Sequence, residues 1–92
     1  MPEAVIRSFA KFREMFGDIN KIDVADGTSV FDAVVAFAEK TEHAEDELLS
    51  DGELKPHIIL MYNRERIDSS DAKEIKVRDG DEIVLYPPVS GG

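Results

Sequence analysis

One amphipathic helix among several short strand-like segments is the feature that most constrains the fold of this chain. Thr28 or Ser29 can accept a backbone hydrogen bond as the N-cap, and the helix extends to about Lys40. Its apolar face recurs at helical spacing, at Val30, Val34, Phe37 and Ala38. A single helix of this length covers only one face of a small sheet, so the sequence predicts an α+β domain with a mixed sheet.

Two strands and a short helix are predicted before this main helix. Alternating apolar and polar residues indicate a first strand from Glu3 to Phe9. A second strand through residues 19–24 would pair with it as a hairpin and end at the turn Asp26-Gly27. The connection between them holds a short amphipathic helix that stops at Gly17. The apolar residues of this short helix are Phe9, Phe12, Met15 and Phe16.

Two further strands are predicted after the main helix. The segment His57–Tyr62 is apolar after its first residue, so both of its faces must be covered or one must be offered to a partner. Residues 63–66 would form its turn. Asp79-Gly80-Asp81 is a strong turn signal that precedes a last strand, Glu82–Tyr86. The acidic segment Thr41–Glu53 predicts a partly helical loop over the surface.

Composition narrows the class of protein. The chain has 92 residues and no cysteine, so one packed core must stabilise it, which suits a reducing cytoplasm. Its net charge of −9 repels phosphate backbones, so nucleic acid is not an expected ligand. The acidity either favours basic protein surfaces or only keeps a small protein soluble. Neither a leader peptide nor an apolar run of bilayer length occurs, so we expect a cytoplasmic protein that does not bind membranes.

The C-terminal segment carries the clearest chemical signal. Pro87 and Pro88 cannot donate backbone hydrogen bonds, so the last strand should stop near Tyr86 and present Val89-Ser90-Gly91-Gly92 away from the body. Gly91 and Gly92 have no side chain and would fit a narrow channel. A carboxylate is a poor acyl donor until it is activated, typically as an adenylate made from ATP. Without the prolines, two glycines would equally suit a frayed end.

The chain resembles the MoaD/ThiS family of ubiquitin-like sulfur carriers over nearly its whole length. The resemblance is carried by the end segment Asp79–Gly92 and by the early segment Phe9–Gly17. The middle segment Asp51–Ile58 is similar to the archaeal branch, which includes the small archaeal modifier proteins. The resemblance implies a β-grasp fold with a four- to five-stranded mixed sheet in residues 1–87, followed by a flexible Gly-Gly tail in residues 88–92.

The resemblance also implies what the tail does. An E1-like enzyme would use ATP to adenylate Gly92, whereas the chain itself would bind no cofactor and supply no catalytic residue. In the modifier branch, the activated Gly92 is joined to a lysine of a target protein through an isopeptide bond. In the carrier branch, it becomes a thiocarboxylate that donates sulfur to a molybdopterin precursor or to tRNA, and the partner is the large subunit of molybdopterin synthase. We expect a modifier, with a carrier role alongside it or in its place, and a monomer when free.

Partner contacts are implied for two arginines and for the residues around the start of the tail, which are Tyr86, Pro87, Pro88 and Val89. Arg13 matches a basic residue at the activation interface, or lies on a solvated helix face. Arg66 stands where some carriers expose an apolar residue against the synthase, which favours the modifier. From the residues alone, Tyr86 would equally suit packing across the strands.

Two other function classes stay open from the sequence. His43 has the helical spacing to bring an imidazole near Asp46 and Glu47, as an enzyme or metal site would need. The chain has only two histidines and no cysteine, which leaves no closed set of zinc ligands, so no metal is expected. The second histidine, His57, is assigned a structural role. A protein that only binds partners non-covalently would have the same fold and the same apolar strand, and its Gly92 would not react.

Overall fold

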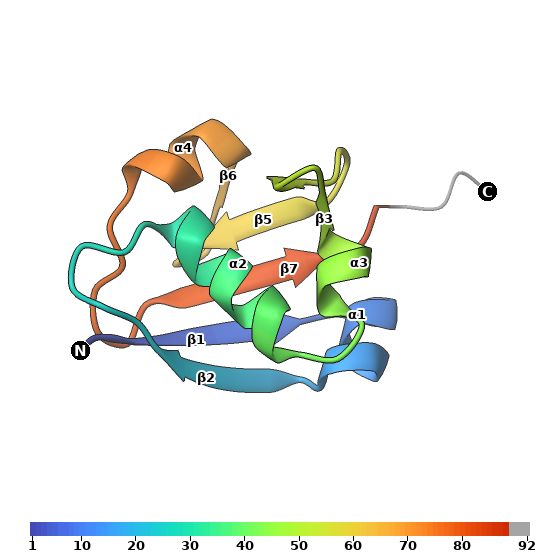
Figure 1. Cartoon of the computed structure of the whole chain (residues 1–92), viewed down its shortest axis with the longest axis horizontal. Coiled ribbons are helices and arrows are strands. Elements are labelled where there is room, and N and C mark those ends of the chain that lie inside the picture. The colour runs from blue at the N-terminus through green and yellow to red at the C-terminus, as the bar shows by residue number, and fades with distance from the viewer. Residues whose placement is uncertain (89–92) are drawn as a thin grey trace.

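The computed structural model describes residues 1–88 and contains a five-stranded mixed sheet with the strand order β2-β1-β7-β5-β6 (Figure 1). β1 pairs antiparallel with β2 and parallel with β7, and β5 lies antiparallel to both β7 and β6. The first and last strands of the chain are therefore neighbours at the centre of the sheet. The strands are β1 (Glu3–Ser8), β2 (Ile19–Asp23), β5 (Ile59–Tyr62), β6 (Glu65–Ile67) and β7 (Glu82–Tyr86).

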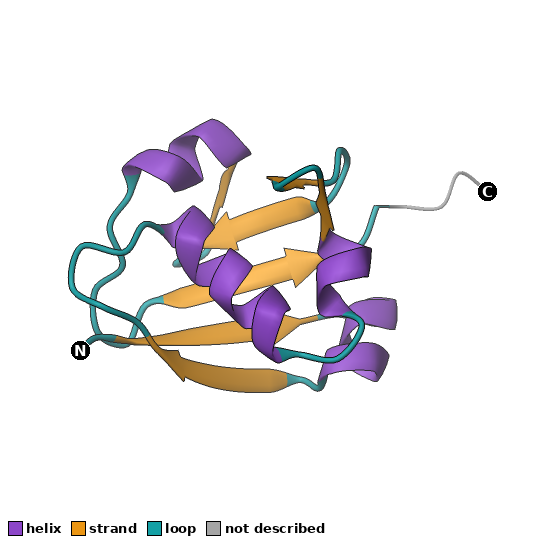
Figure 2. Ribbon diagram, in the orientation of Figure 1, coloured by secondary structure: helices purple, strands orange, loops and turns teal. Residues whose placement is uncertain are grey.

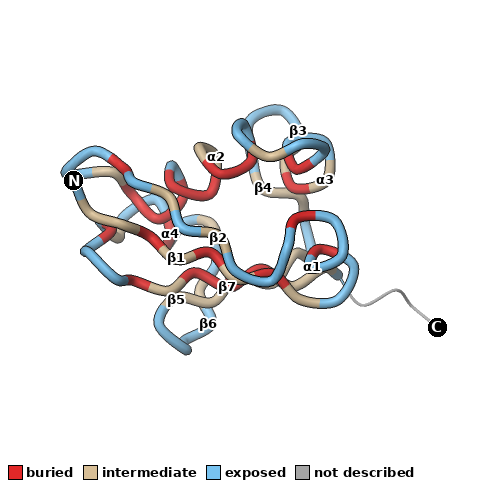
Figure 3. The backbone as a smooth tube through the Cα atoms, turned by 90° about the horizontal axis from the view of Figure 1, so that it is seen from below, coloured by how far each residue is buried: buried red, intermediate tan, exposed pale blue. Residues whose placement is uncertain are grey.

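The main helix crosses one face of this sheet, as the sequence predicts (Figures 1 and 2). It is α2 (Val30–Lys40), and the Ser29 hydroxyl caps it by accepting a hydrogen bond from the Asp32 backbone N–H at 3.0 Å. All four apolar positions of the predicted helix face are buried. They pack against the sheet residues that point the same way, among them Ile6, Ile83 and Leu85. This layer is the hydrophobic core, and it gives the arrangement expected of a β-grasp fold (Figure 3).

The start of the chain largely follows the prediction. β1 and β2 form the expected hairpin, although β1 ends at Ser8, one residue before the predicted end. The short helix is α1 (Ala10–Phe16), followed by Gly17 with a positive φ of 94°. Phe12 and Phe16 are buried, but Met15 is 40% exposed, so its assignment to the apolar face was wrong. Met15 directly precedes Phe16 in the helix and therefore points about a quarter turn away.

The segment predicted as a surface loop, Thr41–Glu53, is more ordered than expected. It contains α3 (Ala44–Leu48) and most of a small hairpin of β3 (Leu49–Ser50) and β4 (Glu53–Leu54). Ala44 and Leu48 are fully buried, because their spacing of four residues places them on one helical face against α2. The predicted partly helical surface segment is confirmed by α3 and by the exposure of most of its residues, but the prediction missed the β3–β4 hairpin and the burial of Ala44 in the core.

The region around β5 and β6 also departs from the prediction. His57 lies in a turn with φ of 73° and is exposed, and the strand begins only at Ile59. The turn after β5 consists of Asn63 and Arg64 alone, so Arg66 is a strand residue of β6 rather than a turn residue. A fourth helix, α4 (Ser69–Glu74), follows and was not predicted. The remaining prediction here is confirmed, since the turn at residues 79–81 leads directly into β7.

Candidate functional site

The face of the sheet opposite α2, here called the open face, carries a row of five side chains in register. Residue pairing across the strands runs from β2 to β6 through Ile19, Arg7, Val84, Met61 and Arg66. Side chains directly opposite each other in adjacent strands lie on the same face and in contact distance. Apolar residues therefore occupy the middle of the open face, with an arginine on each side of them.

Tyr86, at the end of β7, extends the apolar part of the open face. Its ring stacks on the ring of Phe9, with centroids 4.8 Å apart and planes inclined by 12°. The Phe9 backbone N–H donates to the Leu85 carbonyl at 3.2 Å, which holds the two aromatic residues side by side. On the other side of Tyr86, the register places Ile59 of β5. The exit patch, defined as Phe9, Ile59, Met61, Val84 and Tyr86, thus surrounds the point where the last strand ends.

Arg7 lies beside this exit patch and contacts it through its guanidinium. The Arg7 Cζ lies 5.2 Å from the centre of the Phe9 ring, a cation–π distance. Its terminal nitrogens lie 3.7 Å from a Glu82 carboxylate oxygen and 3.9 Å from one of Asp18. Arg7 Nε is buried and has no hydrogen-bond partner among residues 1–88. The guanidinium is therefore fixed mainly by stacking and by two loose ion pairs.

The last strand stops where the prolines predict. β7 ends at Tyr86, and Pro87 and Pro88 follow outside the sheet. Pro87 is half-buried, and Pro88 is exposed. The predicted working residues Gly91 and Gly92, and the predicted contact residue Val89, lie outside the described residues. The division into a domain of residues 1–87 and a tail of residues 88–92 stays a prediction.

The structure separates the two arginines that the resemblance singles out. Arg13 is exposed on α1, which contacts both β1 and β7 at the end of the sheet where β7 ends (Figure 1). Arg66 is exposed on β6 and belongs to the open face opposite Met61, two strands away from Tyr86. Sequence reasoning missed Arg7 and assigned Phe9 to the short helix. The alternation of Val5 and Arg7 along β1, continued by Phe9 directly after it, is the signal that would have placed both on one face.

A polar network supports the opposite end of β7. The buried Asp81 carboxylate accepts hydrogen bonds from the Tyr62 hydroxyl at 2.6 Å, the Asn63 side-chain amide at 3.1 Å and the Arg78 backbone N–H at 2.7 Å. Burial raises the pKa of the Asp81 carboxyl, but these hydrogen bonds and the charge of Arg78 outweigh it and lower the pKa below its ordinary value. Burial and the nearby carboxylate raise the pKa of Tyr62, which stays a donor. The network fixes the β5–β6 turn to the start of β7.

The other predicted constellation does not assemble into a metal site. His43 precedes α3 with φ of 67° and lies 3.4 Å from the Glu42 carboxylate, while Glu47 pairs with Lys11 at 3.5 Å. Within residues 1–88, no group of three or more histidine, aspartate and glutamate side chains is placed to hold a metal ion. No helix in the described part of the chain is long and apolar enough to cross a membrane.

Comparison with known proteins assigns the family. The sequence model of the ThiS family matches residues 6–92 of this chain. The chain belongs to the ThiS family. It is similar to small archaeal modifier protein 3 of Haloferax volcanii, with 31% identity covering 98% of this chain and 99% of that protein. The family recognised from the sequence is therefore confirmed.

Two further similar proteins show the range of the likeness. The crystal structure of SAMP1 from Haloferax volcanii superposes with a TM-score of 0.84 at 32% identity, covering 98% of this chain and 99% of that one. This likeness confirms the ubiquitin-like β-grasp fold. A putative sulfur carrier protein of Archaeoglobus fulgidus is 40% identical over 49% of this chain and 51% of that protein. The chain is thus similar to small archaeal modifier proteins over its whole length and to a putative sulfur carrier protein over about half of it.

Proposed function

We propose that this protein is a ubiquitin-like modifier whose Gly92 carboxylate is adenylated by an E1-like enzyme and then joined to lysines of target proteins. The observation that carries the proposal is the whole-length similarity to a small archaeal modifier protein, with the family match extending through residue 92. The confirmed strand stop at Tyr86-Pro87-Pro88 supports it, because the last strand ends two residues before the segment that must enter a partner.

The chemistry needs two steps that a partner performs. A Gly92 carboxylate oxygen attacks the α-phosphorus of ATP, which forms an acyl-adenylate and releases pyrophosphate. The uncharged amine of a target lysine then attacks the acyl carbon, either directly or after transfer to a thiol, and the nucleotide or thiol leaves. The lysine nitrogen loses its proton to solvent or to a base of the partner, and an isopeptide bond remains.

The exit patch is the surface on which the activating enzyme would dock. Its members are apolar, adjacent and largely half-buried, with Val84 buried beneath them, and they surround the end of β7. Aromatic residues at the centre of an interface typically contribute most of its binding free energy. Arg7 at the border of the patch, and Arg13 on α1, would pair with acidic groups of the enzyme.

Mass spectrometry tests this proposal directly. The protein is incubated with ATP and the E1-like enzyme of its host, and the intact mass is followed. An adenylate, or an adduct joined to lysine through Gly92, supports the proposal, and deletion of Gly91 and Gly92 should abolish both while leaving the circular dichroism spectrum unchanged. An unchanged mass with an enzyme that activates another substrate would show that the chain is a non-covalent module.

A variant pair tests the docking surface. Tyr86→Ala should raise the apparent KM of the E1-like enzyme for this protein by about 10- to 30-fold, because it removes an aromatic contact at the centre of the exit patch. Ile19→Ala is the matched control, since Ile19 lies on the same face but at the far edge strand β2 and is 52% exposed. Equal effects of the two substitutions would place the docking surface elsewhere.

A sulfur-carrier function is the second candidate, favoured by the similarity of half the chain to a putative sulfur carrier protein. Sulfur at the oxidation level of sulfide would then attack the acyl carbon of the same adenylate and displace AMP, which leaves a Gly92 thiocarboxylate and adds the mass of one oxygen-to-sulfur exchange. The two functions are separated in the host. Lysine adducts in cell extracts support the modifier, whereas their absence, together with loss of molybdopterin or tRNA sulfur when the protein is removed, supports the carrier alone.

A further inference from the structure

The chain contains three Asp-Gly pairs, all of them in exposed turns. They are Asp26-Gly27, Asp51-Gly52 and Asp79-Gly80. The three glycines have similar φ angles of 87°, 77° and 85°, and a Cβ added to any of them would meet no heavy atom within 4 Å outside the neighbouring residues. Exposure, glycine conformation and available space therefore do not distinguish the three pairs.

Hydrogen bonds set the third pair apart. The Gly80 N–H donates to the Glu3 carbonyl at 2.8 Å, and a carboxylate oxygen of Asp79 accepts from the Glu3 N–H at 2.8 Å. Both the glycine nitrogen and the aspartate carboxylate of this pair are therefore bound to the start of β1.

The pairs Asp26-Gly27 and Asp51-Gly52 have no such contacts. Neither glycine N–H donates a hydrogen bond to another of residues 1–88. Neither aspartate carboxylate accepts a hydrogen bond or forms an ion pair within the same residues. The reacting groups of these two pairs are therefore free to meet.

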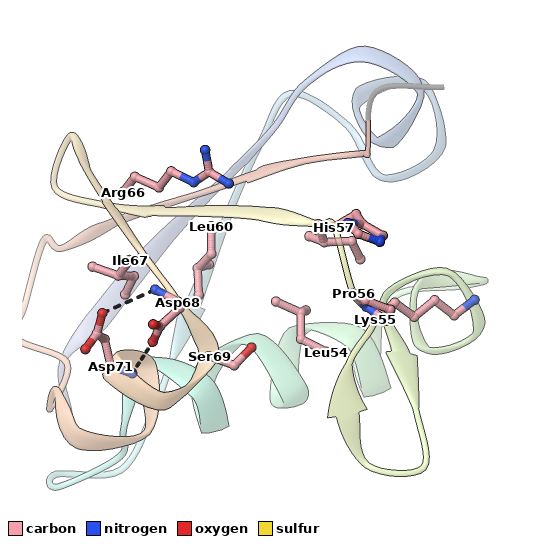
Figure 4. Close-up of a pocket in the computed structure, with 11 residues that line it drawn as sticks. Leu54, Lys55, Pro56, His57, Leu60, Arg66, Ile67, Asp68, Ser69 and Asp71 are labelled. Atoms are coloured by element: carbon pink, nitrogen blue, oxygen red, sulfur yellow. Dashed lines mark hydrogen bonds between the residues drawn. The ribbon is translucent and has the colours of Figure 1, made fainter. Parts of the chain in front are cut away.

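The turn at Asp51-Gly52 also belongs to a short and separate hairpin. β3 and β4 pair only with each other, through a ladder of two residue pairs within Leu49–Leu54. On one side the hairpin borders open space, because Leu54 lines a cleft of about 510 Å³ with Leu60 of β5 on the opposite wall (Figure 4). Segments with so few supporting contacts open locally at a low cost in free energy.

An Asp-Gly pair can rearrange without a catalyst. The glycine nitrogen attacks Cγ of the protonated aspartate side chain, a C–N bond forms, and the carboxyl OH leaves as water with the amide hydrogen. The product is a succinimide ring. Water then adds to the former backbone carbonyl and breaks its bond to nitrogen, which leaves an isoaspartate whose chain continues through Cγ.

We propose that Asp26-Gly27 and Asp51-Gly52 are sites of isoaspartate formation and that the hydrogen bonds to Glu3 protect Asp79-Gly80. Because isoaspartate adds one atom to the backbone, it breaks the two-residue turn between β3 and β4. Its free α-carboxylate is a substrate for an isoaspartate carboxyl methyltransferase, which is the class of partner that the modified protein gains. The protected pair precedes β7, the strand that ends in the exit patch. The proposal is independent of the activation of Gly92.

Oxygen labelling and peptide mapping test the proposal. The folded protein is kept at neutral pH in H₂¹⁸O, because each hydrolysis of a succinimide incorporates one ¹⁸O atom. Trypsin then separates the three pairs into the peptides 22–40, 41–64 and 79–92. We expect the first two peptides to take up ¹⁸O at least about tenfold faster than the third, because both hydrogen bonds to Glu3 must open before Asp79 can react. Uptake by the third peptide as fast as by either of the others would overturn the proposal.

The unfolded chain is the control for the effect of the fold. In concentrated guanidinium chloride the three peptides should take up ¹⁸O at similar rates. A difference that persists there would come from the sequence alone and would refute protection by Glu3.

Two variants assign the label to the proposed residues. Asp26→Glu and Asp51→Glu should each remove the label from their own peptide and leave it in the other, since glutamate forms the larger cyclic imide more slowly. Methylation of the aged protein by an isoaspartate carboxyl methyltransferase should fall in each variant in the same way. Label that survives in the peptide of either variant would place the reaction at other residues and refute the assignment.

Discussion

Replacing Asp81 by alanine should destabilise the protein far more than replacing any carboxylate on its surface. Asp81 is 8% exposed and accepts three hydrogen bonds, from Tyr62, Asn63 and the backbone of Arg78, so one side chain connects β5, the β5–β6 turn and the loop before β7. Removing it leaves all three donors without their acceptor. Of the three residues that donate these hydrogen bonds, Tyr62 is half-buried, whereas Asn63 and Arg78 are exposed.

The size of the effect follows from the geometry. Hydrogen bonds to a charged group contribute about 1.5–3 kcal/mol each, but Asn63 and the Arg78 N–H can regain part of this from water. We therefore expect Asp81→Ala to lower the free energy of unfolding by about 2–4 kcal/mol at pH 7. For a domain of this size the midpoint of thermal unfolding should fall by about 10–25 °C.

The free energy of unfolding that Asp81→Ala loses should depend on pH in one direction. The pKa of Asp81 in the folded protein is lowered, so the unfolded chain binds the proton more readily than the folded chain does. Its contribution to stability is therefore fully present above the unfolded carboxyl pKa of about 4 and is lost as the pH falls through the lower folded pKa. The difference between the wild type and Asp81→Ala should stay constant from pH 7 to about pH 5 and shrink below pH 4.

Thermal and urea unfolding followed by circular dichroism would measure these values. Asp79→Ala is the matched control, because Asp79 lies in the same turn but is exposed and accepts a single hydrogen bond, from the Glu3 backbone N–H at 2.8 Å. The control should lose less than about 1 kcal/mol. The reasoning fails if the two variants lose equal stability, or if the Asp81→Ala difference grows as the pH falls.

Substitutions at three further positions have expected outcomes in the same unfolding assays. Ser8→Ala should raise the free energy of unfolding by about 1 kcal/mol, because the Ser8 hydroxyl is buried and has no hydrogen-bond partner among residues 1–88; a loss of stability would indicate a partner. Arg64→Gly should raise it by about 0.5–1 kcal/mol, because Asn63 and Arg64 have φ of 47° and 73°, and only glycine adopts such a conformation without cost. Ser29→Ala should lower it by about 1 kcal/mol through loss of the α2 cap, whereas Ser29→Asp should retain most of the stability.

The sequence predicted best those elements whose ends carry distinct local signals. The main helix has a capping serine and a full apolar face, and the last strand has a glycine turn before it and two prolines after it. The missed elements are short and contribute few residues to the core. α4 buries only Ala72, so its apolar periodicity is too weak to detect, although the spacing of Asp68 and Asp71 is a capping signal. In β6, Ile67 is the sole apolar residue.

The parts of the candidate site that are adjacent in sequence could be predicted, whereas the contacts between its residues on different strands could not. Tyr86 and the prolines are adjacent in sequence, so the end of the last strand at Tyr86 could be inferred from their order alone. The partners of Tyr86 come from β1 and β5, and a shift of one residue in the register would turn them to the other face. Phe9 fits a helical spacing with Phe12 and Phe16 equally well, and only the parallel pairing of β1 with β7 identifies it as a neighbour of Tyr86.

The parallel pairing of β1 with β7 also sets the order of events when the protein is synthesised. A hydrogen bond links Glu3 to Asp79 across 76 positions, and β7 supplies the central strand, so the sheet cannot close before residues 82–86 have been synthesised. A nascent chain that ends before Glu82 lacks Ile83 and Leu85 from its core and has no folded surface to offer. Folding is thereby tied to the synthesis of the strand that directly precedes Pro87 and Pro88, so truncated products that lack β7 stay unfolded.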